Sequence, residues 1–161
     1  MEKMIRYIER IQIAIGITAL LIFFFAIILQ IGSRHLAISV IWTEEVANYS
    51  FVWAVFMGAA VMVNRRDHFS FDILQNKLKG KKRLSLNIVI DTLLILFNIG
   101  ILYYGIQVVE QFWNYTWTAL PFMKMGYVWI SIPIMAGTMI IYSLFHFIEH
   151  VKGMAGSEVQ Q

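Results

Sequence analysis

Four apolar stretches of about 20 residues alternate with polar connections along this chain. Residues 11–31, 46–63 and 127–147 contain no Asp, Glu, Lys or Arg, and residues 88–109 contain only Asp91. In a helix that rises about 1.5 Å per residue, stretches of this length match a hydrocarbon core about 30 Å thick. The pattern predicts an all-α integral membrane protein in which four transmembrane helices form a single membrane domain over residues 1–161.

Basic residues are concentrated in the connections on one side of the predicted membrane. Eleven of the 13 Lys and Arg residues precede the first stretch, lie between the second and third, or follow the fourth. Arg34 and Lys124 are the other two. Short loops rich in Lys and Arg remain in the cytoplasm. We therefore predict that both termini and the loop 64–85 are cytoplasmic, and that the turns 32–45 and 110–126 face outward.

Local patterns add three expectations to this topology. Within the loop, residues 69–79 mix apolar and polar positions as a short amphipathic helix at the inner interface would, and Gly80 would end it. The third stretch stays largely apolar from Leu84 to Trp113, so a helix of that length must tilt in the membrane. Pro133 lacks a backbone donor, and we expect a kink in the fourth helix there.

Composition narrows the possible functions. The chain has 161 residues, no cysteine and a net charge of +3. Without cysteine there is no disulfide, thiolate metal site or iron–sulfur cluster. The positive charge lies at the ends of predicted spans, where it favours contact with anionic membrane lipid over nucleic acid. The first stretch is longer than the apolar part of a typical signal peptide and lacks a small-residue cleavage signature, so we expect it to be retained.

The outer end of the second predicted helix carries the densest polar cluster. Trp42, Thr43, Glu44 and Glu45 open this helix. Thr43 can cap it, and the two carboxylates interact favourably with the positive end of the helix dipole. The same carboxylates could instead pair with Arg34 or meet a partner protein. Arg34, Trp42, Glu44 and Glu45 are therefore candidate contacts with another subunit or a binding protein.

Two further patterns indicate helix packing. Ser50, Ala54 and Gly58 recur every four residues, a spacing of small side chains that lets another helix approach closely. Asp91 and Asn98 lie on one face of the third helix, together with Asn87 and Gly105. An ionisable residue within a span is a functional candidate, but here the stripe favours packing over proton or ion coupling.

The sequence shows no arrangement typical of catalysis. His35 and His68 lie in opposite loops, while His146 and His150 share the end of the fourth helix. No two histidines face each other at matched depth, as a membrane haem would require. Nucleophile motifs, phosphate-binding loops and paired catalytic carboxylates are also lacking. We predict that the chain is not an enzyme and binds no cofactor itself.

Several motifs in order along the chain give it a family resemblance. The first are Arg34 and the segment Trp42 to Glu45. The inner-loop segment Arg66 to Leu74 follows, in which Arg66, His68 and Asp72 are the polar motif residues. The last are Leu120-Pro121, Gly126 to Trp129, and Pro133. Together these resemble the small membrane subunit, DctQ- or SiaQ-like, of tripartite ATP-independent periplasmic (TRAP) transporters. The chain departs from the family where it has Gly80 at the loop end and the basic cluster Lys81-Lys82-Arg83.

The resemblance implies a sodium-coupled uptake system in the bacterial inner membrane. A periplasmic substrate-binding protein would deliver an organic acid, of the sialic-acid or C4-dicarboxylate type, to a large membrane subunit. That large subunit would hold the substrate and sodium sites, and this chain would be its scaffold. Two alternatives stay open: a self-contained four-helix exporter of cations or drugs, and a haem or quinone membrane-anchor subunit.

Overall fold

The computed structural model describes residues 2–38, 40–65 and 81–156. Helices α1 (Glu2–His35), α2 (Trp42–Arg65), α4 (Lys81–Phe112), α5 (Gly126–Trp129) and α6 (Ser131–Gly156) make up most of these residues. Across the described ranges there is no β-strand, and the single bridge joins Thr116 to Lys124. Four segments are long and apolar enough to cross a membrane: Glu2–His35, Trp42–Arg65, Arg83–Phe112 and Gly126–Met154. The predicted fold class of four membrane-spanning helices is confirmed.

The helices extend beyond the apolar stretches from which they were predicted. Helix α1 begins nine residues before residue 11, because Lys, Arg and Glu are good helix formers that continue the helix into polar surroundings. Helix α4 begins at Lys81, so residues 81–85 of the expected loop are helical. The amphipathic helix expected within residues 69–79 lies outside the described residues.

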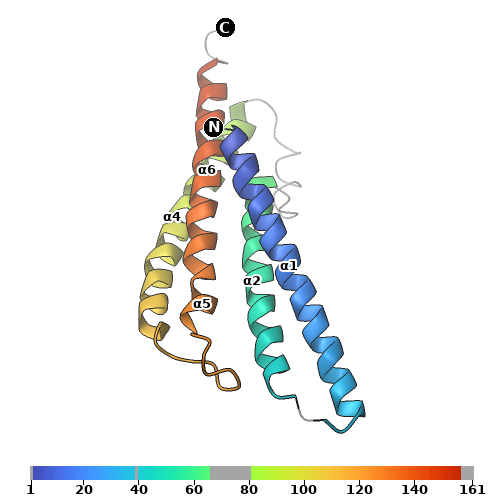
Figure 1. The fold of residues 1–161 in the computed structure, drawn as a ribbon. Coiled ribbons are helices and arrows are strands. Elements are labelled where there is room, and N and C mark those ends of the chain that lie inside the picture. Colours follow the sequence, from blue (N-terminus) through green and yellow to red (C-terminus); the bar gives the residue numbers. More distant parts are fainter. Residues whose placement is uncertain (1, 39, 66–80, 157–161) are drawn as a thin grey trace.

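The helices form two hairpins that lie side by side. One hairpin pairs α1 with α2, and the other pairs α4 with α6, with α2 and α6 in contact between them. Figure 1 shows both termini at one end, which we call the terminal end. The turns between α1 and α2 and between α4 and α5 lie at the opposite end, which we call the loop end. An even number of spans requires this arrangement, whereas the side of the membrane that each end faces stays a prediction.

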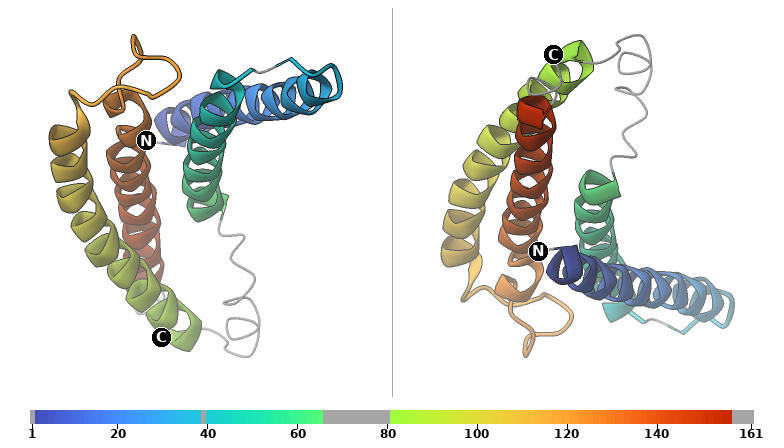
Figure 2. Two further views of the ribbon diagram at one scale, coloured as in Figure 1. Left: turned by 90° about the horizontal axis from the view of Figure 1, so that it is seen from below. Right: turned by 90° about the horizontal axis from the view of Figure 1, so that it is seen from above.

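A small apolar core joins the hairpins near the terminal end. Six buried residues form it: Ile5, Ala60, Val63, Met135, Met139 and Tyr142. Viewed along the bundle, α1 crosses the other helices at a steep angle, so only its first turns reach α6 (Figure 2). Among the described helices, the rest of α1 packs mainly against α2. The two hairpins are therefore joined most tightly near the terminal end.

The fourth predicted helix is interrupted one turn before its proline. Helix α5 ends at Trp129 and α6 begins at Ser131, with Ile130 between them. Pro133 cannot donate a hydrogen bond to the carbonyl of Trp129, four residues earlier, and its ring crowds that carbonyl. The backbone resumes with Ile134 N donating to Ile130 O at 3.3 Å. The helix is thus interrupted at Ile130, one turn before the proline at which the kink was expected.

Helix α4 curves past α6 over its whole length (Figure 2). Its 32 residues correspond to about 48 Å, longer than a bilayer core, as its apolar sequence predicted. At Gly105 α4 lies close to α6, because an added Cβ there would lie 2.8 Å from Ile132 Cγ2. A glycine there allows α4 to lie against the start of α6.

Candidate functional site

A buried amide ties the first helix to the last. Gln12 of α1 is 3% exposed and lies against α6. Its Nε2 donates to Thr138 Oγ1 at 2.7 Å, and its Oε1 accepts from the hydroxyl of Tyr142 at 2.5 Å. Tyr142 is fully buried, so Gln12 supplies the acceptor that its hydroxyl needs in apolar surroundings. These two bonds fix the position of α1 against α6.

A second polar cluster joins three helices closer to the terminal end. Glu9 accepts from Arg65 Nε at 2.6 Å and from Asn64 Nδ2 at 3.0 Å, which links α1 to the end of α2. The Asn64 carbonyl lies 3.0 Å from Nε2 of His146 on α6. The Glu9 side chain is only 15% exposed, so its carboxylate is largely shielded from solvent. The cluster holds α1, α2 and α6 together beside the core.

The polar stripe predicted on α4 faces α6. Asn87, Asp91 and Asn98 are all buried. Asp91 Oδ2 lies 2.9 Å from Nδ1 of His150, and Asn87 Nδ2 lies 3.4 Å from Nε2 of the same ring. Asn98 donates to the Leu94 carbonyl of its own helix at 2.8 Å. The stripe therefore brings Asp91 and Asn87 to one histidine, whereas Asn98 bonds within α4.

At the loop end, Glu45 holds the connection between α4 and α5. Its Oε1 accepts from the backbone N–H of Thr118 at 2.8 Å, and its Oε2 accepts from that of Ala119 at 2.9 Å. Hydrogen bonds from backbone amides to a carboxylate are stronger than those between neutral groups. Glu45 thereby links α2 to the second hairpin, and its carboxylate is occupied within the chain.

Replacing Glu45 by Gln is expected to loosen this connection. A neutral amide keeps one acceptor oxygen and loses the other, so we expect a loss of about 1.5 kcal/mol of local stability. Hydrogen exchange of the Thr118 and Ala119 amides measures this directly. The matched control is Glu44→Gln, which alters an exposed carboxylate one residue away. Equal exchange rates in the two variants would contradict the role of Glu45.

The remaining residues of the predicted loop-end cluster lie apart from Glu45. Arg34, Trp42 and Glu44 are exposed, and among the described residues Arg34 forms no ion pair with either glutamate. The pairing with Arg34, one of the alternatives left open from the sequence, is not formed: Glu45 binds the backbone of the second hairpin instead. Thr43 also differs from its predicted capping role, because its hydroxyl donates to the Val40 carbonyl at 2.9 Å.

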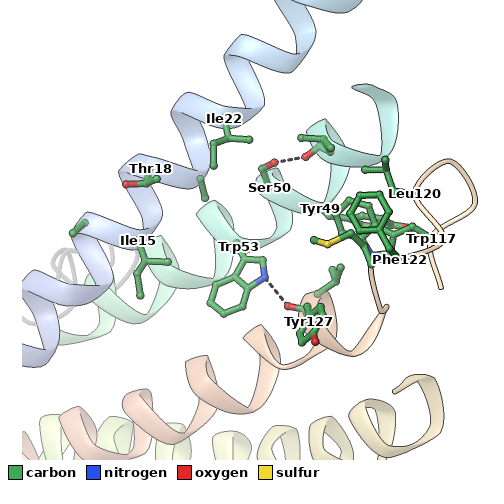
Figure 3. A pocket seen from close by; sticks show the side chains of 15 residues that line it. Ile15, Thr18, Ile22, Tyr49, Ser50, Trp53, Trp117, Leu120, Phe122 and Tyr127 are labelled. Carbon is green, nitrogen blue, oxygen red and sulfur yellow. Dashed lines mark hydrogen bonds between the residues drawn. The ribbon is translucent and has the colours of Figure 1, made fainter. Parts of the chain in front are cut away.

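An aromatic groove opens between the two hairpins at the loop end. Its volume is about 620 Å³, and side chains of α1, α2, the α4–α5 connection and α5 line it (Figure 3). Trp53 closes one side by donating from Nε1 to the Tyr127 carbonyl at 3.0 Å. The rings of Tyr49 and Trp117 pack with centroids 4.5 Å apart. The surface so formed is apolar and suits an acyl chain or an apolar helix.

The small residues of α2 divide between this groove and a second one. Ser50 lines the aromatic groove, and its hydroxyl donates to the Val46 carbonyl. Ala54 and Gly58 line a groove of about 370 Å³ along α1 and α2. Ala54 packs near Gly16 of α1, where an added Cβ would lie 3.8 Å from the Ala54 carbonyl. Gly58 is exposed, with no atom within 4 Å of an added Cβ.

Three partners in these links were not singled out from the sequence. Gln12, Glu9 and His150 each bind a polar group on another helix. Gln12 could have been found, because an amide within a stretch free of charged residues is a buried polar group that needs a partner. Glu9 and His150 lie in polar flanks, and nothing in their local sequence distinguishes them.

The remaining candidate residues from the sequence are the inner-loop motif and the histidines. Arg66, His68 and Asp72 of the inner-loop motif lie outside the described residues. Within the described ranges, no three His, Cys, Asp or Glu side chains come together as a metal site would need. His35 is exposed at the end of α1, whereas His146 and His150 both lie on α6.

Comparison with known proteins identifies relatives of this sequence. Residues 23–153 match the family model for the DctQ component of tripartite ATP-independent periplasmic transporters. The sialic acid TRAP transporter permease protein SiaT of Haemophilus influenzae is 27% identical over 145 residues, which is 89% of this chain but 23% of SiaT. A putative TRAP transporter small permease protein of the same species is 33% identical over 54 residues, 34% of each chain. The matches thus span 23% and 34% of these relatives' lengths.

Proposed function

Because this chain belongs to the DctQ component family of TRAP transporters, we propose that it is the small membrane subunit of such a transporter. In this role it braces a large membrane subunit that carries an organic acid inward. The observation that supports the proposal most is the family match, which covers residues 23–153 and so includes part or all of each apolar helix. The chain is a multi-pass membrane protein of a transporter permease family.

The hydrogen bonds between the helices of this chain suit a subunit that braces a larger one. Gln12, Glu45 and the carbonyl of Asn64 each join the first hairpin to the second, and Glu9 joins α1 to α2. Among the described spans only the fourth is interrupted, at Ile130, whereas substrate sites in many transporters lie between two interrupted helices. A rigid frame with apolar outer faces can hold the fixed part of a larger protein in the bilayer. We place the substrate and sodium sites on that large subunit.

We further propose sialic acid as the substrate and a sodium gradient as the driving force. Support for the substrate comes from SiaT, whose name refers to sialic acid. The exposed Arg34, Trp42 and Glu44 then face the periplasm as contacts for a substrate-binding protein. In this arrangement the chain lies in the bacterial inner membrane with both termini in the cytoplasm.

Reconstituted transport tests this function. Proteoliposomes would contain the large subunit with or without this chain, and the binding protein would be added outside with labelled sialic acid. We expect uptake only when this chain, the binding protein and an inward sodium gradient are all present. Equal uptake without this chain would contradict the bracing role. Uptake of a C4-dicarboxylate in place of sialic acid would overturn the substrate assignment alone.

The exposed backbone at Gly58 is our proposed contact for a helix of the large subunit. A glycine facing outward lets a second helix approach closely enough for dispersion and weak hydrogen bonds to act. We expect Gly58→Leu to reduce the amount of large subunit that copurifies with this chain. Gly100→Leu on α4 is the control, because an added Cβ there also meets no atom within 4 Å. If equal amounts of the large subunit copurified with both variants, the contact would lie elsewhere on this chain.

The described residues favour neither alternative function. An exporter working alone needs a carboxylate deep in an early helix, whereas Glu9 lies near the start of α1 and binds Arg65 and Asn64. A haem anchor needs facing histidines, whereas His150 lies beside Asp91. The bracing role is the function that these contacts support best.

A further inference from the structure

The first three turns of α1 carry a basic face that is turned away from the bundle. Lys3, Arg6, Tyr7 and Arg10 line a depression of about 250 Å³. Their spacing of three and four residues places them on one side of the helix. The buried residues of the same helix include Ile5 and Gln12, which face the core and α6. The depression therefore opens outward.

The charge of this face is largely uncompensated. Arg6 lies 4.0 Å from Glu2, but both side chains are more than 60% exposed, and such a pair contributes little. Glu9, the nearest other carboxylate in sequence, is bound to Arg65 and Asn64. Among the described residues, Lys3 and Arg10 form no ion pair. The face thus offers three cations and a tyrosine hydroxyl to an anion, an arrangement suited to phosphate.

The same face of α1 continues as an exposed apolar stripe. The buried residues Ile5, Gln12, Ala19, Ala26 and Ser33 recur every seven residues. Opposite them, beyond Arg10, lie Ala14, Ile17, Leu21, Phe25 and Ile28, all exposed. From Arg10 to Leu21 the helix rises about 16 Å, close to half of a hydrocarbon core about 30 Å thick. That length matches the acyl chain of one leaflet.

We propose that this face binds an anionic phospholipid. The phosphate group lies among Lys3, Arg6 and Arg10, and an acyl chain follows the apolar stripe past Ile17 and Leu21. The positive charge of the face favours an anionic headgroup. Because the basic face continues directly into the apolar stripe, it favours a lipid over free phosphate. Basic side chains at the membrane surface attract anionic lipid by about 1 kcal/mol each. The site is independent of the proposed transport role, because it lies entirely on α1.

Titration of the purified full chain with phosphatidylglycerol in a nonionic detergent, followed by native mass spectrometry, tests the site. Each basic residue removed is expected to weaken binding about fivefold, so Arg6→Gln/Arg10→Gln should raise the apparent Kd roughly 25-fold. The matched control is Arg83→Gln/Lys152→Gln, which removes two exposed basic residues at the same end of the bundle. Its Kd should stay near that of the wild type.

Three results would overturn the proposal. One is an unchanged Kd in the Arg6/Arg10 variant, and another is an equal loss in the control variant, which would indicate general attraction to charge. The third is displacement of the lipid by excess inorganic phosphate, which would indicate a site for free phosphate. If the double variant does not fold, lipid binding by the wild type alone tests the proposal. It should bind phosphatidylglycerol at least about fivefold more tightly than zwitterionic phosphatidylcholine, and equal affinity would reject the site.

Discussion

Replacing His150 by Leu is expected to lower the free energy of unfolding by about 3 kcal/mol, the largest effect among our predicted variants. The carboxylate of Asp91 is buried and lies 2.9 Å from the His150 ring. Removing the histidine takes this partner from the buried carboxylate, and Asn87 also loses the ring nitrogen at 3.4 Å. Thermal unfolding in detergent, followed by circular dichroism, measures the loss.

A second variant shows whether the cost comes from breaking the contact between Asp91 and His150. Replacing both partners of a buried pair by apolar residues is often close to neutral, because neither polar group of the pair is left behind. Asp91→Leu/His150→Leu should therefore be more stable than His150→Leu alone. His35→Leu is the control, since this histidine is exposed at the end of α1. A double variant less stable than the single one would contradict this explanation.

Replacing Gln12 by Leu is expected to cost about 2 kcal/mol and to loosen α1 from α6. The variant removes the acceptor of the Tyr142 hydroxyl, which is fully buried, and a buried group left unpaired costs about 1 to 3 kcal/mol. The bond to Thr138 is lost as well. Thermal unfolding measures the stability. Energy transfer between one fluorophore on α1 and another on α6 measures the distance between the two helices.

Tyr142→Phe added to Gln12→Leu should recover part of that loss, because the unpaired hydroxyl is then absent. Gln107→Leu is the control: it removes a glutamine exposed on α4. If Gln12→Leu and Gln107→Leu unfold at the same temperature, the amide of Gln12 does not hold the hairpins together.

Much of the fold follows from hydropathy, because a bilayer requires each span to satisfy its own backbone hydrogen bonds as a helix. That constraint located all four apolar helices and the interruption near Pro133. The helix ends were less predictable, since α1 and α4 continue through basic residues that hydropathy assigns to the flanks. Charged residues with high helix propensity extend a helix into the interface without a hydropathy signal.

The polar links were harder to predict because each depends on how two distant segments meet. Glu45 looked equally suited to pairing with Arg34, yet it binds amides 73 and 74 residues later in the chain. His150 reaches Asp91 across 59 residues, and no local pattern marks that pair. Such contacts depend on how α2 meets the second hairpin and how α4 curves past α6, which follow from the packing of whole helices.

The most direct test of the bracing role is to purify the tagged chain from its native membrane in mild detergent. Mass spectrometry then identifies the proteins that elute with it and their stoichiometry. We predict one much larger membrane protein of a TRAP transporter in about equal amount. Elution as a homo-oligomer with no larger membrane protein would contradict that role.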